Sequence, residues 1–351
     1  MEEPQRAFLN ELLETATPAG FEHPGQAVWL SYVKPFADEV RTDAYGNAVA
    51  TIHGDDRAVA LTGHADEIGL MVRDIEDDGS IRMVRIGGSD RTISKGQHVT
   101  IHAEDGPIPG VIGQTAIHLR SSEDESIDDI EEQHIDIGVT SEAAAADLVE
   151  RGDPITFSQR VVDLAGDRMV ARGLDNRIGI WAAAEGLRRA AALEPNVTIH
   201  AISTVQEEVG LQGAKMVGFD LDADAVAVTD VTHATDAGDI PSDQTTGVEI
   251  GGGPVIARGS ANHPSVVNAM RVAAKEADIE VQFEAAGNRT GTDADGFYTA
   301  SGGIPSVSVS VPNRYMHTPV ELISTADLDA TATLLATFAA TADQFTFQTE
   351  L

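Results

Sequence analysis

Two adjacent glutamates, Glu207 and Glu208, follow a strongly apolar run that begins at Val197. The run is rich in Val, Ile and Thr, as is usual for a strand that is buried on both faces. In open α/β sheets ligands bind outside the carboxyl ends of the strands, so this strand brings two acids to the place where chemistry is usually done. Because neighbouring carboxylates on a bent backbone can point in different directions, one can bind a metal ion while the other transfers a proton.

Four other potential metal ligands occupy comparable places in the chain: His64, Asp175, Asp230 and His317. Each lies at or just after a predicted strand end, or where a strand gives way to a helix. In a mostly parallel sheet these ends gather at one edge, so we expect the side chains to meet. Together with Glu208 they form a set of two histidines and three carboxylates, with Glu207 to spare. This is the donor set of a two-metal hydrolytic site, in which closely spaced metals favour a bridging carboxylate.

Taken singly, these residues have simpler explanations. His64 and Asp66 also fit a turn histidine beside a solvated acid. Asp175 directly precedes a strongly helical segment, where aspartate is a good N-cap. Only the complete set favours a metal site, and there Asp66 would accept a hydrogen bond from the second ring nitrogen of His64.

The elements that must position these residues alternate between strands and helices. Apolar spacing predicts helices over 4–15, 24–33, the segment after Asp175, 264–277 and 326–340. Strands are predicted over 39–43, 48–53, 58–63, 197–210, 224–229, 280–284 and 304–311. We therefore expect an α/β fold with a mixed, mostly parallel sheet sandwiched by helices. The glycine-rich loop 287–296 lacks the spacing of a phosphate-binding loop.

A different pattern occupies 70–160, where short alternating strands are separated by many Gly, Asp and Pro residues. Strands over 81–86, 98–102 and 110–114 predict a small β-barrel or sandwich, with one helix over 141–150 and an acidic loop over 121–132. We interpret this block as an inserted domain. The catalytic domain would then comprise 1–69 and 161–351.

The composition limits the classes of partner. Of the 351 residues, 57 are acidic and 23 basic, which gives a formal net charge of −34. Such acidity argues against binding to nucleic acids or to anionic membranes, which are themselves negatively charged. With 4 Lys against 19 Arg, it suggests adaptation to high salt, where the Debye length is about 3 Å at 1 M. The chain has no Cys, so a metal site must use His, Asp and Glu. Without a basic leader or a long apolar segment, a cytoplasmic protein is expected.

Five segments carry a resemblance to a known family: GHADEIG at 63–69, ARGLDNR at 171–177, TVQEEVG at 204–210, AVTDV at 227–231 and RYMHTP at 314–319. Their order and spacing resemble those of the dinuclear-metal tetrahedral (TET-type) aminopeptidases, a family that includes glutamyl and deblocking aminopeptidases. The similarity covers nearly the whole chain, including the insertion after the first metal-binding histidine. It implies a zinc-peptidase fold and removal of the N-terminal residue from peptides by a two-metal-activated water.

The resemblance also implies a role for each residue. Asp175 would bridge two divalent ions, zinc or cobalt with manganese possible. Glu208 and His317 would complete one metal site, and His64 and Asp230 the other. Glu207 would be the general base, and Asp66 would orient His64. In the family the inserted domain makes a dimer contact, and dimers assemble into a dodecamer.

Three alternatives remain open from the sequence. Another metal hydrolase, such as a carboxypeptidase or a deacylase, could use the same ligands. A glycosidase could use Glu207 and Glu208 as its acid and base, although such a pair must flank a sugar about 5–9.5 Å apart. A self-assembling shell protein with a silent site would need no chemistry at all, but the complete ligand set argues against it.

Overall fold

Eight strands form the central sheet of this computed structural model, which describes residues 1–120, 126–238 and 240–348. In order across the sheet they are β1 (Glu39–Thr42), β2 (Ala48–Ile52), β12 (Val197–Thr204), β3 (Asp55–His64), β13 (Ala225–His233), β16 (Ser306–Asn313), β14 (Val255–Gly259) and β15 (Gln282–Ala286). The central strands β12, β3, β13 and β16 pair in parallel. Strands β1 and β2 join at one side antiparallel, and β14 joins β16 antiparallel at the other. The mixed, mostly parallel sheet predicted from the sequence is confirmed.

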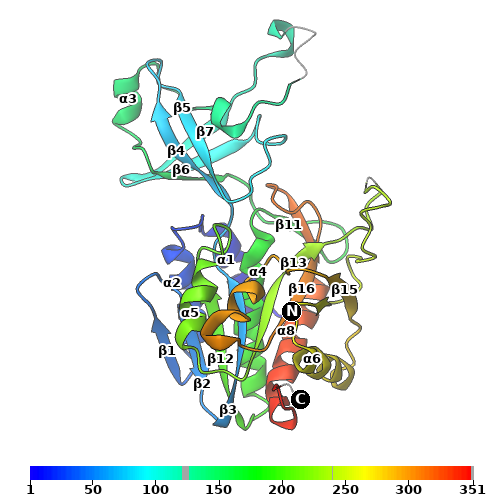
Figure 1. Ribbon diagram of the computed structural model, residues 1–351. Helices are drawn as coiled ribbons and strands as arrows, with labels where there is room; N and C mark the ends of the chain where they lie inside the picture. The colour runs from blue at the N-terminus through cyan, green and yellow to red at the C-terminus, as the bar shows by residue number, and fades with distance from the viewer. Residues whose placement is uncertain (121–125, 239, 349–351) are drawn as a thin grey trace.

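Helices cover both faces of this sheet (Figure 1). Five lie on one face: α1 (Glu3–Glu14), α2 (His23–Val33), α4 (Leu174–Ala191), α6 (Pro264–Glu276) and α8 (Thr325–Ala340). Two shorter ones, α5 (Gln212–Asp220) and α7 (Ala294–Phe297), lie on the other face. Successive residues of β3 show the alternation, since Val59 and Leu61 join the larger core and Ala60 the smaller one. Burial on both faces explains why these strands are almost continuously apolar.

A closed barrel stands apart at one end of the sheet (Figure 1). Its six strands, in order around the barrel, are β4 (Gly69–Ile75), β5 (Ile81–Ile86), β8 (His134–Asp136), β7 (Gly106–Ile112), β6 (His98–Ala103) and β9 (Pro154–Phe157). All neighbouring strands are antiparallel, and they enclose an apolar core of their own. The β-barrel predicted from the alternating pattern is confirmed.

Small elements complete the barrel region. Helix α3 (Glu142–Ala146) begins after Ser141, whose side chain accepts a hydrogen bond from Ala144 as a cap, but it ends four residues earlier than predicted. A 3-10 turn at Ile117–Leu119 precedes the predicted acidic loop, and a second at Ile130–Glu132 forms the end of it. Residues 121–125 of that loop lie outside the described residues.

A three-stranded sheet lies beside the central one, formed by β10 (Val162–Asp163), β11 (Arg168–Ala171) and β17 (Glu321–Ser324). The sequence analysis did not predict β17, which follows the HTP segment and leads directly into α8. Further 3-10 turns occur at Ala300–Gly302 and Ala342–Gln344. In the described part of the chain, no helix has both the length and the apolar character needed to cross a membrane.

Candidate metal centre

All seven predicted site residues meet at the end of the sheet where β3 and β12 end. His64 is the last residue of β3, and Glu207 and Glu208 lie in the turn after β12. The predicted strand 197–210 is therefore too long, because β12 ends at Thr204 and the chain turns before the two acids. Asp230 lies within β13, not after it, because β13 stays paired with β16 as far as His233.

Asp175 is shared between two histidines. One of its carboxylate oxygens, Oδ1, lies 3.2 Å from Nε2 of His64, and the other, Oδ2, lies 3.4 Å from Nε2 of His317. Asp230 Oδ1 lies 3.9 Å from Nε2 of His64, and Glu208 Oε1 lies 3.6 Å from Nε2 of His317. Two groups of potential ligands thus share one carboxylate: His64, Asp175 and Asp230 in one, and Asp175, Glu208 and His317 in the other.

The start of α4 shows why Asp175 is available for this role. Asp175 and Asn176 have non-helical backbone angles, so regular helix follows them. Asn176 Oδ1 accepts a hydrogen bond from the Gly179 N–H, three residues on, which is the bond that an N-cap side chain makes. Asn176 therefore does the work that the sequence analysis considered for Asp175, whose carboxylate is left to face the two histidines.

Each histidine ring has a polar partner outside the cluster. His64 Nδ1 lies 3.1 Å from the backbone oxygen of Asp66 and 3.3 Å from its carboxylate Oδ1. The His317 ring makes a hydrogen bond with the backbone of Gly88, in the segment that follows barrel strand β5. A partner on one ring nitrogen fixes the ring and leaves the other nitrogen free to bind a metal.

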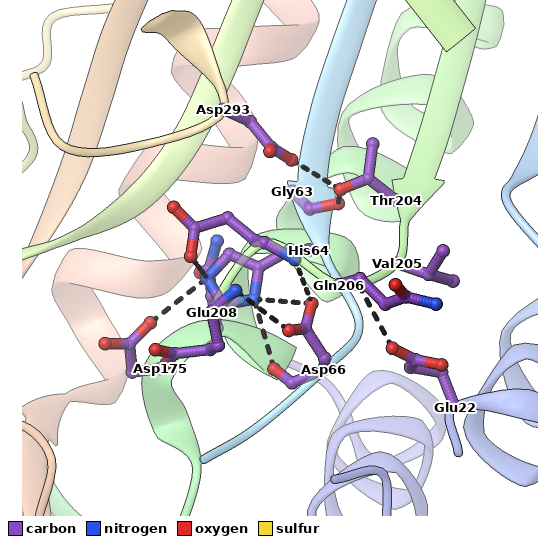
Figure 2. A network of polar contacts seen from close by, with 12 residues as sticks. Glu22, Gly63, His64, Asp66, Asp175, Thr204, Val205, Gln206, Glu208 and Asp293 are labelled. Carbon is purple, nitrogen blue, oxygen red and sulfur yellow. Dashed lines mark hydrogen bonds and ion pairs between the residues drawn. The ribbon is translucent and has the colours of Figure 1, made fainter. Parts of the chain in front are cut away.

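Asp66 also fixes the turn that carries the two glutamates (Figure 2). Its Oδ1 accepts a hydrogen bond from the Glu207 N–H and its Oδ2 from the Glu208 N–H, each at 3.0 Å. The buried carboxylate of Asp66 thereby connects the His64 ring to the backbone of Glu207 and Glu208. The sequence analysis anticipated the contact with His64 but not these two amide contacts.

Glu321 is a buried residue of the site that sequence reasoning missed. Its carboxylate accepts hydrogen bonds from the N–H groups of Asp175 at 2.9 Å and His317 at 3.0 Å, and so links two of the potential ligands. The available signal was a glutamate inside the apolar run VELI, because a carboxylate in a buried strand needs partners.

The loop over 287–296 was also missed as part of the site. Arg289, Thr290, Gly291 and Thr292 line the cleft above the cluster, which has a volume of about 390 Å³. Asp293 anchors this loop to the central sheet, because its carboxylate accepts a hydrogen bond from the hydroxyl of Thr204 at the end of β12 (Figure 2). The sequence analysis excluded phosphate binding by this loop but gave it no other role.

Burial and mutual repulsion make the carboxylates of the cluster hard to ionise together. Burial is the main reason that the pKa of Glu207 rises to about 9 and that of Asp230 to about 8, and neighbouring acids, among them Asp175, add to both shifts. Burial also raises the pKa of Glu208 well above its ordinary value. Asp175 alone shifts the other way: burial opposes its ionisation, but its hydrogen bonds with the two histidines lower its pKa. The cluster thus holds more buried carboxylates than its histidines can neutralise.

These residues fit a pair of divalent cations. Imidazole nitrogens and carboxylate oxygens suit zinc and related ions, and the ligand atoms within each group lie within 4.8 Å of one another. Divalent cations would also supply the positive charge that the buried carboxylates require. The shared carboxylate of Asp175 is suited to two neighbouring ions.

A family of known proteins matches most of this chain. The sequence profile described as M42 glutamyl aminopeptidase matches residues 46–334. A lysyl aminopeptidase of Pyrococcus furiosus is 33% identical over 332 residues, which cover 93% of this chain and 94% of the relative.

Two solved structures are also similar over nearly the full length of both chains. A TET aminopeptidase from the archaeon Thaumarchaeota archaeon SCGC AB-539-E09 has a TM-score of 0.90 with 29% identity and covers 96% of each chain. The TET1 peptidase of Pyrococcus horikoshii has a TM-score of 0.84 with 28% identity, covering 95% of this chain and 99% of that one. The resemblance found in the five sequence segments is confirmed. The chain belongs to the M42 glutamyl aminopeptidase family, and it is a peptide hydrolase of the aminopeptidase class.

Proposed function

We propose that this aminopeptidase holds two divalent cations and removes the N-terminal residue of peptides with a water molecule as nucleophile. The observation that carries the proposal is the division of Asp175 between His64 and His317, which creates two ligand groups around one carboxylate. His64, Asp175 and Asp230 would hold one ion, and Asp175, Glu208 and His317 the other. When bound, such ions lower the pKa of water from about 15.7 toward about 7 and polarise a carbonyl group. Zinc or cobalt suits these donors, and manganese can also occupy them.

Glu207 is the general base of the proposed reaction. Its carboxylate lines the cleft, and its Oε2 lies 3.9 Å from His64 Nε2, so it borders the ligand groups. A third grouping of His64, Glu207 and Glu208 is also close enough to bind a metal. We assign Glu207 to proton transfer because the two groups that share Asp175 already use the other five residues. Glu207 takes a proton from water in the cleft and returns it to the leaving amine.

Asp66 acts through its neighbours in this proposal. It orients the ring of His64 and holds the amides of Glu207 and Glu208, so the metal-binding histidine and the base keep a fixed relative position. The substrate's free α-amino group would bind among the carboxylates at the inner end of the cleft. This placement of the amine limits cleavage to the first peptide bond.

The structure gives little support to a glycosidase. A carboxylate oxygen of Glu207 lies within 4.8 Å of a carboxylate oxygen of Glu208. An acid and base pair that flanks a sugar needs a larger separation, of about 5–9.5 Å. Both histidines would also have no role. A peptidase uses every member of the cluster.

We further propose that the barrel over 70–160 is a dimerisation domain and that dimers assemble into a closed dodecamer. The barrel stands away from the central sheet of the proposed catalytic domain, which comprises 1–69 and 161–351 (Figure 1). The barrel is therefore accessible to a second copy of the chain. Support comes from the similar P. horikoshii TET1 peptidase, which can assemble into a tetrahedron or a large octahedral shell. Location in the cytoplasm and adaptation to high salt remain predictions from the sequence.

Blocked peptides test the proposed function. The metal-loaded protein should cleave a short peptide with a free N-terminus and leave its N-acetylated form almost unchanged. The acetyl group blocks the α-amino group that would position the first peptide bond for cleavage. Released amino acids and shortened peptides can be followed by mass spectrometry at molar salt. Equal rates on the two peptides would contradict an aminopeptidase and favour an endopeptidase or a deacylase.

A further inference from the structure

Glu22 is a buried glutamate at the start of α2, only 3% exposed, that contacts the turn carrying Glu207 and Glu208. Its Oε1 accepts a hydrogen bond from the Gln206 N–H at 3.0 Å and another from the Gly20 N–H at 2.7 Å. One oxygen thus joins the connection between α1 and α2 to the residue just before the proposed base. Figure 2 shows this contact on the opposite side of the turn from Asp175.

The turn itself has an unusual backbone. Gln206 has a φ of +56°, a left-handed conformation that a residue with a side chain rarely adopts without support. Successive N–H groups in turns of this kind form a concavity that binds anions. Here the N–H groups of three consecutive residues, 206 to 208, each point at a carboxylate oxygen: Glu22 receives the first and Asp66 receives the next two.

The segment that carries Glu22 is itself fixed. The Thr17 N–H donates to Oε1 of Glu67 and the Ala19 N–H to the backbone oxygen of Glu67, both near 3 Å. Glu67 follows Asp66 directly and pairs with Arg172 and Arg177 in the interior. Glu22 and Asp66 therefore both bind the turn, and the backbone segments that carry them are hydrogen-bonded to each other.

We infer that Glu22 is a positioning residue for the hydrolytic reaction, which fixes the backbone of Gln206 and so sets the direction of the Glu207 carboxylate. This inference rests on the proposed role of Glu207. Glu22 does not line the cleft and belongs to neither ligand group, so it acts on the reaction through the turn. A base displaced by about 1 Å loses up to about 10²-fold in rate, which makes such positioning measurable.

Both hydrogen bonds to Glu22 end on the same oxygen, so the contact needs an acceptor but not a negative charge. Burial raises the pKa of Glu22 to about 7, which shows that charge is costly at this position. A glutamine has the same length and offers a carbonyl oxygen to the two N–H groups. Alanine has no acceptor, and aspartate is one methylene too short to reach both donors.

Four variants test the inference on metal-loaded enzyme at molar salt, with a free-amine peptide as substrate. Glu22→Ala and Glu22→Asp should lower kcat about 10-fold or more, with KM within about 2-fold and with wild-type metal content. Glu22→Gln should keep kcat within about 2-fold of the wild type. Glu185→Ala is the matched control, because Glu185 is also a buried glutamate but bonds to Tyr32, Arg188 and Arg189, away from the cleft. It should lower stability while leaving kcat of the folded enzyme unchanged.

The outcomes distinguish a failure of the positioning role of Glu22 from a failure of the proposed function. Wild-type kcat in folded Glu22→Asp would overturn the positioning role, and so would equal losses in Glu22→Gln and Glu22→Ala. If Glu22→Ala does not fold, Glu22→Asp and Glu22→Gln decide the question. A wild-type enzyme that cleaves acetylated and free peptides equally would instead contradict the proposed function, whatever the Glu22 variants show.

Discussion

Asp175 places one carboxylate oxygen 3.2 Å from Nε2 of His64, while its second oxygen faces His317. A carboxylate shared in this way should be the most damaging potential ligand to lose. We predict that Asp175→Ala binds fewer metal ions per chain than Asp230→Ala or Glu208→Ala, since each of those residues belongs to only one of the two groups that share Asp175. Metal analysis of the three dialysed variants checks the order. Two ions per chain in Asp175→Ala would rule out the bridge.

Gly88 links the barrel to the candidate metal centre through its contact with His317. A Cβ atom at this position would lie 2.5 Å from Nδ1 of His317, closer than real Cβ atoms come to any neighbour. Gly88→Ala should therefore displace the ring and lower metal affinity by about 10–100-fold, the usual effect of disturbing the support of a ligand.

Gly113→Ala provides the control for Gly88→Ala, because Gly113 also follows a barrel strand but a Cβ there has no described atom within 4 Å. Calorimetric metal titration of both variants makes the comparison. Equal affinities would show that the Gly88 segment does not support His317.

Glu67 should make the stability of the fold depend on pH. Burial opposes its ionisation, but Arg172 and Arg177 prevail and lower its pKa below the ordinary value of 4.5. The ionised carboxylate therefore stabilises the folded state above about pH 4.5, and this contribution is lost as the pH falls through the lowered pKa. Glu67→Gln should cost about 3–5 kcal/mol of unfolding free energy at pH 7, because it leaves buried arginines without their counter-charge.

Urea unfolding at constant molar salt, at pH 7 and below pH 4, measures this effect. The difference between the wild type and Glu67→Gln should shrink at the lower pH. Asp74→Asn, which breaks a surface pair with Arg151, should hardly change the unfolding midpoint at either pH. A Glu67→Gln effect that is independent of pH would contradict the charge-based explanation.

The sequence predicted which side chains meet at the site better than it predicted their surroundings. His64, Asp175 and Glu208 could be found because chemistry-bearing residues beside apolar strands stand out, and parallel strands bring such residues to one edge. Asp230 was identified although the end of its strand was misplaced, since β13 continues only because β16 pairs with it over the same length. That pairing is a tertiary contact and leaves no local signal.

The supporting residues were harder to predict because their partners are distant in sequence. Glu321 bonds to the Asp175 amide, 146 residues away, and Glu22 bonds to the Gln206 amide, 184 residues away. The apolar run VELI marks Glu321 as a buried glutamate but does not reveal its partners, and nothing in the local pattern distinguishes Glu22 from the many exposed glutamates in so acidic a chain. The role of Asn176 as the cap also required the structure, because Asp175 is an equally good cap on composition alone.

Assembly should depend on salt. Each chain carries a formal charge of −34, so copies repel one another strongly at low ionic strength, whereas at 1 M salt screening acts within about 3 Å. We predict that the closed oligomer and its activity are lost together when salt is dialysed away. Light scattering and turnover across a salt series check this. A fully active monomer of 37.0 kDa at every salt concentration would show that neither the barrel contact nor the dodecamer exists in this protein.

The most direct test of the two-cation, Glu207-dependent reaction is a metal titration of the apoprotein, with bound ions and peptide turnover measured on the same samples. For the wild type we predict that turnover rises with occupancy and is complete at two ions per chain. Glu207→Gln should bind the same number of ions and turn over at least about 10²-fold more slowly, the scale of lost general-base catalysis. Full turnover by metal-free protein, or near-normal turnover by metal-loaded Glu207→Gln, would contradict the account.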